Sequence, residues 1–445
     1  MNEPMDTAER VLELVRAAVP GAEAAVTVRH GNQALTRFAN GFIHQNVAEE
    51  IAHVALQVAF DGHDADATAD GSGDAVLQRL VATAVEAARA RPADPGWPGP
   101  AAPEPAPQID HWDDATGAAT PEDRARCVRD FVTAAGDLQA AGSCRTQGET
   151  VAFANSAGQR LIGRASAAVL SGIARSGTSD GSARDASARL ADLDAAALGQ
   201  RARQKALDAA EPTDLDPGTY EVVLEPQCVA NMLEFLFQYG FNGRAFEEGR
   251  SFVRLGELQF DPAITLVDDA TEPLQLGVGF DAEGTPKRRV ELVQAGVTSA
   301  VLHTRRTAAR AGVRSTGHAT EGGTALGALP SNVLLAAGDR PLDALVGAMA
   351  RGLLVTDFWY TRILDPRTQV VTGLTRNGVW LVEDGRPVRP VRNLRFTQSF
   401  REALAPGSVL GVSAERARIV PDPGVAYLVP ALRLGAWRFT GGVRS

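Results

Sequence analysis

The chain has 445 residues, of which 44% are hydrophobic and 22% are charged, and its formal net charge is −10 at pH 7. This length exceeds what one hydrophobic core usually serves, so two or three domains are expected. The acidic balance argues against nucleic-acid binding, which needs a basic face, and the lack of an apolar run of about 18 residues argues against a membrane span.

The first region mixes helical and strand patterns. Residues 6–18 have apolar side chains at helical spacing, with Asp6 or Thr7 as N-cap. Short strands are predicted at 24–30, 34–39, 42–47 and 53–60. The HGN and NG residues between them favour turns. Residues 74–91 predict an amphipathic helix, so this region reads as helix, strand meander and helix.

Residues 91–107 hold seven prolines and predict an extended connection. The second region then opens with a helix that has Thr120 as N-cap and Pro121 in its first turn. Strands near 143–153, 158–163 and 166–174, a turn at 176–182 and a helix at 188–210 follow. This region again sets helices beside strands.

Beyond Pro217 the pattern changes to an apolar helix at 228–240 followed by short β runs, with a further helix predicted at 340–351. NG and DG pairs between residues 370 and 396 predict two turns that separate three strands. We therefore expect an α+β protein with an N-terminal layered helix/strand region and a β-rich C-terminal domain. The predicted regions are 1–110, 111–215 and 216–445.

Common catalytic motifs are absent from the sequence. It contains no HExxH, GxGxxG or Walker motif, and its one Gly-x-Ser-x-Gly match, GTSDG at 177–181, lies in a segment that is predicted to be a turn. We interpret the group of His44, Glu49, Glu50 and His53 as polar side chains on the protein surface. The group of Asp61, His63, Asp64 and Asp66 is interpreted as a solvent-facing hairpin, and the Lys/Arg clusters at 287–289 and 305–310 as solvated faces.

The three cysteines, Cys127, Cys144 and Cys228, are widely spaced and form neither a disulfide framework nor a zinc knuckle. Cys228 has no adjacent histidine and reads as a buried thiol. The N-terminus is acidic and amphipathic, unlike a signal peptide. A cytoplasmic location is expected.

The apolar helix CVANMLEFLFQYG carries one carboxylate, Glu234, and no histidine. A glutamate in such a helix can be a general base beside a metal, or a residue on the solvent side. Motifs elsewhere in the chain bear on this choice.

Four segments follow one another in the C-terminal half. They are FDAEG, with Phe280, Asp281, Glu283 and Gly284; Thr307 with Ala308; Ser315, Thr316 and Gly317; and Gly378, Glu383, Gly385, Pro387 and Val388. In this order they resemble the TldD/PmbA family, the paired proteins of a cytoplasmic metalloprotease. The resemblance covers most of the chain and matches the expected domain layout.

Catalytic members of this family carry HExxxH on the first helix of the C-terminal domain, where two histidines bind zinc and the glutamate polarises water. The resemblance aligns that motif with LEFLFQ, so Leu233 and Gln238 take the places of the histidines and Glu234 that of the glutamate. Residues 215–260 hold no histidine, and no cysteine follows Cys228. The resemblance therefore implies a chain without its own zinc and without catalytic residues, similar to the PmbA (TldE) branch.

The same resemblance implies a heterodimer with a TldD-type catalytic subunit, which would hold the zinc and enclose a chamber for unfolded peptide. Two alternatives stay open. One is an independent hydrolase with a relocated site that uses Asp281, Glu283, His303 and His318. The other is a peptide-binding module in the tailoring of a natural product.

The aromatic residues Phe358, Trp359 and Tyr360 stand together in DFWYTRI. Adjacent aromatic residues usually pack in a core, but they are also enriched at interface hot spots and on surfaces that grip peptide. We therefore consider them candidates for contact with a partner subunit or a peptide.

Overall fold

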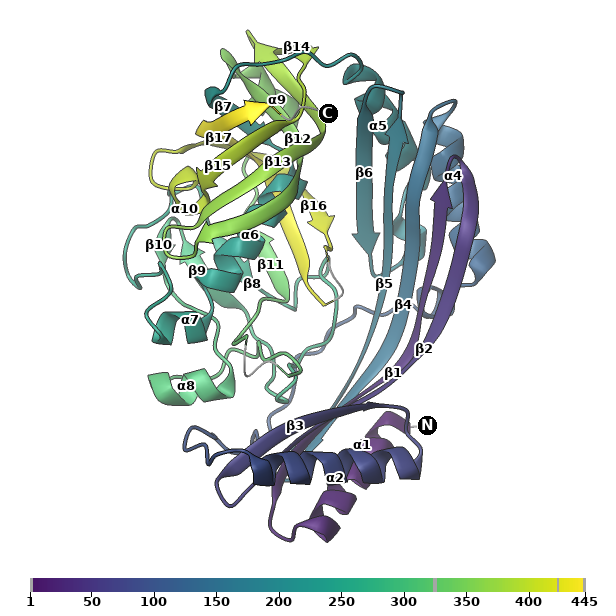
Figure 1. Ribbon diagram of the computed structural model, residues 1–445, viewed down its shortest axis with the longest axis vertical. Coiled ribbons are helices and arrows are strands. Elements are labelled where there is room, and N and C mark those ends of the chain that lie inside the picture. The colour runs from purple at the N-terminus through teal and green to yellow at the C-terminus, as the bar shows by residue number, and fades with distance from the viewer. Residues whose placement is uncertain (1–2, 323–325, 422–423, 443–445) are drawn as a thin grey trace.

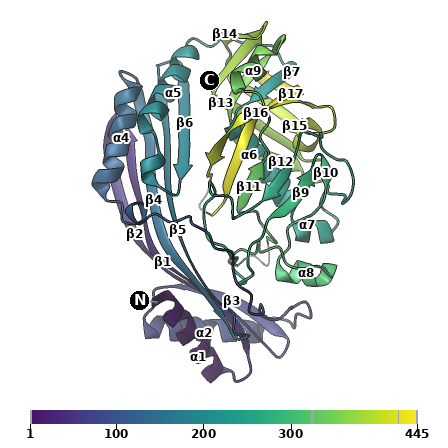
Figure 2. The same ribbon diagram turned by 180° about the vertical axis from the view of Figure 1, so that it is seen from behind.

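A computed structural model describes residues 3–322, 326–421 and 424–442 of the chain. Two β-sheet regions lie side by side, a long curved sheet from the N-terminal part and a second sheet from the C-terminal part (Figure 1). The reverse view shows the same arrangement (Figure 2). This confirms the predicted α+β fold with a β-rich C-terminal part.

The N-terminal sheet has six antiparallel strands in the order β3-β2-β1-β4-β5-β6. The strands are β1 (Glu23–Ala39), β2 (Phe42–Phe60), β3 (His63–Asp70), β4 (Gln139–Asn155), β5 (Arg160–Arg175) and β6 (Asp180–Ser187). The helical segments of this part are α1 (Glu3–Ala18), α2 (Asp74–Ala90), α3 (Asp114–Gly117), α4 (Pro121–Ala135), η1 (Leu190–Asp192) and α5 (Ala195–Asp208).

One face of this sheet is covered by helices at both ends. Helices α1 and α2 pack on residues such as Val26, Val28 and Leu56, while α4 and α5 pack on residues such as Cys144 and Leu170. These side chains are even-numbered, so they share one face of the pleated sheet. The opposite, odd-numbered face turns toward the C-terminal part (Figure 1).

The predicted regions 1–110 and 111–215 share this single sheet. Strand β1 pairs with β4 from Ala25↔Asn155 to Phe38↔Gly142, so hydrogen bonds run without interruption across the two regions. Each region nevertheless has its own hydrophobic cluster beneath its own helices. The proline-rich segment between them has neither helix nor strand, as expected.

Several short strands predicted for the first region are parts of longer ones. HGN lies within β1, where Gly31 pairs with both Ile51 and Glu149, so the turn predicted there is wrong. The NG pair does form the turn, with φ of 51° at Asn40 and 77° at Gly41. Since β2 and β4 flank β1 along most of its length, the ladder on both sides keeps the HGN segment extended.

The second predicted region has the same kind of correction. Strand β5 spans both predicted runs after residue 158 in one piece. The chain after the predicted turn forms β6, so helix α5 begins only at Ala195 instead of at 188. The start of α4 is as predicted, because Thr120 and Asp123 form a reciprocal capping box with Pro121 in the first turn.

The C-terminal sheet has eleven strands, most of them along the order β10-β9-β8-β11-β17-β15-β13-β12-β7. The strands are β7 (Gly218–Leu224), β8 (Leu266–Asp268), β9 (Val290–Gln294), β10 (Val297–Thr298), β11 (Asn332–Leu335), β12 (Arg351–Asp365), β13 (Val370–Glu383), β14 (Arg386–Pro390), β15 (Leu394–Ser399), β16 (Val409–Ile419) and β17 (Ala426–Gly442). The helices are α6 (Pro226–Tyr239), α7 (Gly243–Glu247), α8 (Arg305–Ala311), α9 (Leu342–Gly347) and α10 (Phe400–Ala403).

The NG pair in β13 does not form the predicted turn. Asn377 and Gly378 have φ of 59° and 125°, and the register to β12 shifts opposite them, so they form an irregularity inside one strand. The DG pair at Asp384 and Gly385 does turn the chain from β13 into β14. The helix predicted at 340–351 is shorter, as α9 shows.

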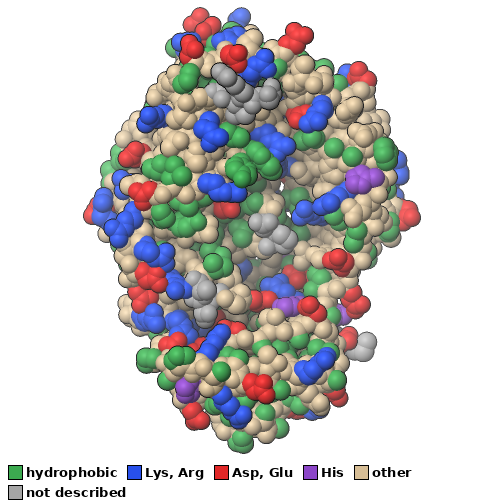
Figure 3. Space-filling view, in the orientation of Figure 1, with side chains coloured by type: hydrophobic (Ala, Val, Ile, Leu, Met, Phe, Trp, Pro, Cys, Tyr) green, Lys and Arg blue, Asp and Glu red, His purple; other side chains and the backbone are tan. Residues whose placement is uncertain are grey.

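The two parts meet across an interface that involves β6. Strand β6 contacts β16 and β13, and α5 contacts β13. The space-filling view shows a hollow between the two parts, with Lys and Arg side chains beside it (Figure 3). In the described part of the chain, no helix is both long and apolar enough to cross a membrane.

Candidate functional site

Helix α6 is the first helix of the C-terminal sheet region and contains the LEFLFQ segment. Leu233 is 1% exposed and packs in the main core, whereas Gln238 is exposed to solvent. Between them Glu234 is half-buried, and its Oε2 lies 3.4 Å from the amide nitrogen of Asn231, which donates to it. The positions aligned with the two zinc histidines therefore point into different surroundings.

The donor atoms at this helix do not fit a zinc site. Zinc in proteins takes nitrogen, sulfur or carboxylate oxygen ligands, and a leucine side chain offers none. Across the described residues, no group of three or more His, Cys, Asp or Glu side chains is arranged to hold a metal ion. We therefore assign no zinc-dependent step to residues of this chain.

The FDAEG segment forms a tight loop around the carboxylate of Asp281. Its Oδ1 accepts the backbone N–H groups of Glu283 and Thr285, each at 2.9 Å, and its Oδ2 accepts that of Ala319 at 2.9 Å. Burial raises the pKa of Asp281, although these three hydrogen bonds oppose the rise. Asp281 thus ties the loop to the segment after Thr316.

The same segment docks onto the N-terminal sheet. Phe280 packs with Phe153 of β4, and the amide of Gln159 donates to the carbonyl of Gly284 at 3.0 Å. Gly284 has φ of 68°, and a Cβ there would lie 2.1 Å from the Phe153 ring. Only glycine fits such a close approach, so this motif joins the two parts of the molecule.

Glu283 faces a polar cavity between the two parts. The cavity has a volume of about 750 Å³ and is lined by strands β1 to β3, the segment after α2, and helices α7 and α8. The Glu283 carboxylate accepts the backbone N–H of Arg305 at 2.7 Å. Burial, and then the charge of Asp281, raise the pKa of Glu283 to about 7.

Arg306 lines this cavity, and its ion pairs contradict two interpretations made from the sequence. It pairs with Asp64 of β3, with N···O of 3.2 Å, and with Asp94. Arg306 and Asp64 are both largely buried. The basic cluster at 305–310 is thus not simply a solvated face, and Asp64 does not lie on a solvent-facing hairpin, because each charge is buried against the other.

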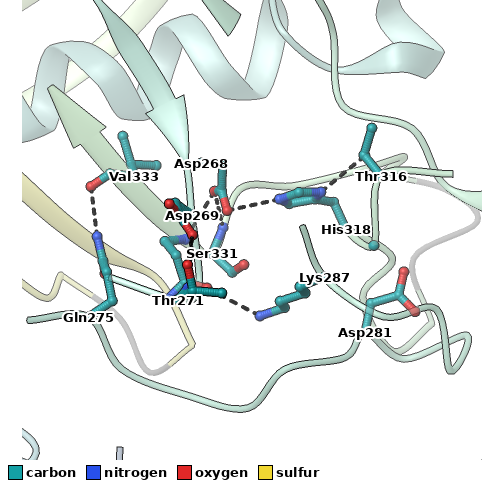
Figure 4. Close-up of polar contacts among 12 residues, drawn as sticks. Asp268, Asp269, Thr271, Gln275, Asp281, Lys287, Thr316, His318, Ser331 and Val333 are labelled. Carbon is teal, nitrogen blue, oxygen red and sulfur yellow. Dashed lines mark hydrogen bonds and ion pairs between the residues drawn. The ribbon is translucent and has the colours of Figure 1, made fainter. Parts of the chain in front are cut away.

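Thr316 and His318 belong to a buried polar cluster (Figure 4). The His318 ring lies with Nδ1 3.0 Å from the Thr316 hydroxyl and Nε2 2.9 Å from Asp268 Oδ1. Asp268 Oδ2 also accepts the backbone N–H groups of Ser331 and Asn332. The order of acid, imidazole and hydroxyl resembles a hydrolase triad.

The side chains of His318 and Asp268 are only 0% and 1% exposed, however. The Thr316 hydroxyl is itself held by the backbone N–H of His303 at 2.7 Å, and Ser315 donates to the His303 carbonyl at 3.1 Å. A substrate cannot reach these groups. The cluster therefore positions the loop that contains Gly317.

The residues named for a relocated hydrolase site do not form one open site. Glu283 lines the cavity, whereas Asp281 and His318 are buried. His303 Nδ1 lies 3.1 Å from the Thr307 hydroxyl, and burial lowers the pKa of His303. None of these contacts joins a nucleophile to a base at an accessible surface.

The aromatic segment of β12 divides between the core and the surface. Phe358 is buried and stacks on Trp437 with ring centroids 5.2 Å apart. Trp359 and Tyr360 are 53% and 65% exposed. The guanidinium of Arg376 lies over the Trp359 ring, 4.1 Å from its centroid, in a cation–π contact.

Lys287 and Asp268 also belong to the buried cluster, and their contacts were not predicted from the sequence. The Lys287 amine donates to the Asn332 side-chain oxygen at 3.3 Å (Figure 4). Burial lowers the pKa of Lys287, while the charges of Asp268 and Asp281 oppose the change. No local signal marks these contacts, since Asp268 is an ordinary acid in LVDDA that meets His318 fifty positions later.

Comparison with known proteins agrees with this architecture. A family model described as the PmbA/TldA metallopeptidase C-terminal domain matches residues 217–441. The crystal structure of TldE from Thermococcus kodakarensis superposes with a TM-score of 0.87 at 20% identity, covering 98% of this chain and 100% of that one. This likeness shows the fold.

Curated relatives match part of the chain. A metalloprotease of Methanothermobacter thermautotrophicus is 24% identical over 218 residues, 46% of each protein. A metalloprotease TldD homolog of Buchnera aphidicola is 24% identical over 199 residues, 44% of this chain and 41% of the relative. The matched stretch thus spans less than half the length of these relatives.

Proposed function

The chain belongs to the PmbA/TldD metallopeptidase family, and on this premise we propose that it is a non-catalytic partner subunit of a TldD-type zinc protease. In this role it pairs with a zinc-binding relative in the cytoplasm and helps to enclose and hold unfolded peptide for cleavage. The zinc resides in the partner.

Helix α6 carries this proposal. The side chains at the two histidine positions are a buried leucine and an exposed glutamine, and neither leaves a place for zinc beside Glu234. Without a metal, Glu234 has no polarised water to deprotonate. A chain that keeps the family fold without these ligands is suited to a supporting role.

The inner face of the N-terminal sheet supports a role in holding peptide. Its odd-numbered side chains turn away from the helices and toward the C-terminal part, and many are polar and at least partly exposed, such as Gln33, Arg37 and Gln147. A polar wall beside a hollow suits an extended chain that offers main-chain hydrogen-bonding groups along its length.

We predict that the purified chain alone holds far less than one zinc per molecule and cleaves no peptide. Metal analysis of protein prepared without chelators, with a protease assay on unfolded casein, checks this. Co-expression with an HExxxH-bearing relative should yield a co-purifying pair that contains zinc and cleaves. About one zinc per isolated chain, with chelator-sensitive cleavage, contradicts the proposal and favours an independent hydrolase.

We further predict that Glu234→Gln leaves peptide cleavage by the reconstituted pair within about twofold of the unmodified pair. The reason is that Glu234 lacks a metal-bound water to act upon. The matched control is the same Glu→Gln change in the HExxxH motif of the partner, which should abolish cleavage. A loss of about 100-fold from Glu234→Gln in an assembled pair would make Glu234 a catalytic residue.

A further inference from the structure

Three adjoining cavities form one groove between the N-terminal sheet and the C-terminal part. Their volumes are about 440, 170 and 480 Å³. Arg145, Val169 and Val420 line both the first and the second cavity, and Arg184 lines both the second and the third. Figure 3 shows a hollow between the same two parts of the molecule.

The sheet side of this groove follows β5. Ala165, Ala167, Val169 and Ser171 line it, and Ser182 of β6, the partner of Ile173, lines its far end. These odd positions share the face that the helices leave uncovered. From 165 to 173 an extended strand spans about 26 Å at roughly 3.3 Å per residue, so the groove can hold about eight residues of extended chain.

The second and third cavities are basic, although the whole chain carries a net charge of −10. Six basic side chains line them, namely Arg145, Arg184, Arg201, Lys205, Arg416 and Arg418. Three acidic side chains line them, namely Asp185, Glu225 and Glu415. Such a concentration of one sign between protein walls raises the local concentration of ligands of opposite charge.

Ion pairs within the protein neutralise only part of this positive charge. Arg184 pairs with Asp357 at 2.9 Å and Lys205 with Glu225 at 2.6 Å. Within the described part of the chain, the side chains of Arg145, Arg201 and Arg416 make no hydrogen bond or ion pair, and all three residues are exposed. Two carboxylates, Asp185 and Glu415, also lack an ion pair there, which leaves an excess of positive charge.

The third cavity also holds polar atoms without partners. Thr356 is 3% exposed, and its hydroxyl oxygen has no hydrogen-bond partner in the described structure. The same holds for the side-chain oxygen of Gln227. Both residues line the cavity, next to the N-terminus of α6, where no side chain caps the helix. A carboxylate placed here would accept a hydrogen bond from the Thr356 hydroxyl and meet the positive end of the helix.

We propose that this groove binds an extended acidic peptide segment, with its carboxylates set between Arg201 and Arg416. The apolar side chains of Leu35, Val47 and Val169 along the first cavity suit peptide side chains. Single-stranded nucleic acid is the other polyanion to consider, but it is bound by stacking on aromatic rings. No aromatic residue or histidine lines the three cavities in the described structure.

The test measures binding of a fluorescent ten-residue peptide that alternates Glu and Val to the full-length chain at low salt. Arg201→Gln/Arg416→Gln should weaken binding roughly five- to tenfold, as expected for two partly exposed charge contacts. Arg79→Gln/Arg89→Gln on α2 is the matched control, since it removes the same charge from exposed positions outside the groove and should leave the affinity unchanged.

A peptide with Gln in place of Glu should bind at least fivefold more weakly than the acidic peptide. Equal affinity for the two peptides, equal weakening by both double variants, or tighter binding of an oligothymidine would each overturn the inference. It rests on the proposed function, but the assay needs no partner. A chain that assembles with its partner yet fails this assay overturns the groove inference alone, whereas failure to assemble contradicts the proposed function.

Discussion

Asp268→Ala is expected to lower the free energy of unfolding by about 3–5 kcal/mol, the usual cost of removing one member of a buried charge pair. The Asp268 carboxylate faces His318 at 2.9 Å and accepts two backbone N–H groups (Figure 4). Its removal leaves these donors, and the charge of Lys287 nearby, without a compensating acceptor. Urea unfolding followed by tryptophan fluorescence measures the loss.

Two control variants separate this effect from a general sensitivity to the loss of an acidic side chain. Asp214→Ala removes a carboxylate that is 90% exposed in its pair with Arg392, and it should change stability by no more than about 0.5 kcal/mol. Asp268→Asn keeps an acceptor for the backbone N–H groups and should fall between wild type and Asp268→Ala. If Asp268→Ala is as stable as Asp214→Ala, the buried cluster does not hold the loop.

The pH dependence of this effect has a definite sign. Burial alone would raise the pKa of Asp268, but the charge of His318, the hydrogen bond from His318 and that from Asn332 outweigh it and hold the pKa below its ordinary value. The stability from this depressed pKa is therefore present above the ordinary value, near 4, and is lost as the pH falls through the folded-state value. The difference between wild type and Asp268→Ala should shrink below about pH 4.

Local chemistry explains what the sequence predicts correctly. Thr120, Pro121 and Asp123 are contiguous, and their capping box depends on no distant partner. The position of α6 follows from an uninterrupted apolar run, and the four motif segments are local as well. The fold class and the position of α6 could therefore be predicted from the sequence.

The incorrect predictions concern residues whose contact partners lie far away in the sequence. HGN and NG have similar turn chemistry, but Gly31 is held between Ile51 and Glu149, whereas Asn40 has no such ladder on both sides. The contact between Asp268 and His318, and that between Arg306 and Asp64, join segments that no spacing rule connects. The groove is likewise made by β5, β6 and β16 meeting across two parts of the molecule.

The aromatic segment shows how one irregular strand changes the surface. In a regular strand, Phe358 and Tyr360 would share one face and Trp359 would lie on the other. Here the pairing register of β12 with β13 shifts between Trp359 and Arg362, and Tyr360 has φ of 54°. The bulge places both Trp359 and Tyr360 in solvent while Phe358 stays buried. The sequence alone could not show this.

The end of β12 that carries these rings also has a free edge. Strand β7 pairs with β12 only from Gly352 to Val355, so among the described residues the part of β12 after Val355 has a strand partner, β13, on one side only. A free strand edge can accept another strand through main-chain hydrogen bonds. Exposed aromatic residues at such an edge fit an interface with a partner subunit.

Trp359→Ala is therefore expected to weaken assembly with the proposed catalytic partner by about 30-fold, the effect of losing a hot-spot contact of about 2 kcal/mol, while the chain stays folded. Size-exclusion chromatography across a dilution series measures assembly, circular dichroism checks folding, and a peptide-cleavage assay on the pair reports function. Phe42→Ala is the matched control, because Phe42 is 60% exposed in the other sheet and should leave all three unchanged.

Phe358→Ala separates the interface from the core. Phe358 stacks on Trp437 and contacts Phe396, with ring centroids 4.6 Å apart for the second pair, so its removal should lower the free energy of unfolding by about 3–5 kcal/mol. An unfolded Trp359→Ala chain would show that the indole stabilises the fold through its contact with Arg376. A folded Trp359→Ala chain with unchanged assembly but reduced cleavage would assign Trp359 to peptide binding. A folded chain with unchanged assembly and unchanged cleavage would exclude Trp359 from both the interface and peptide binding.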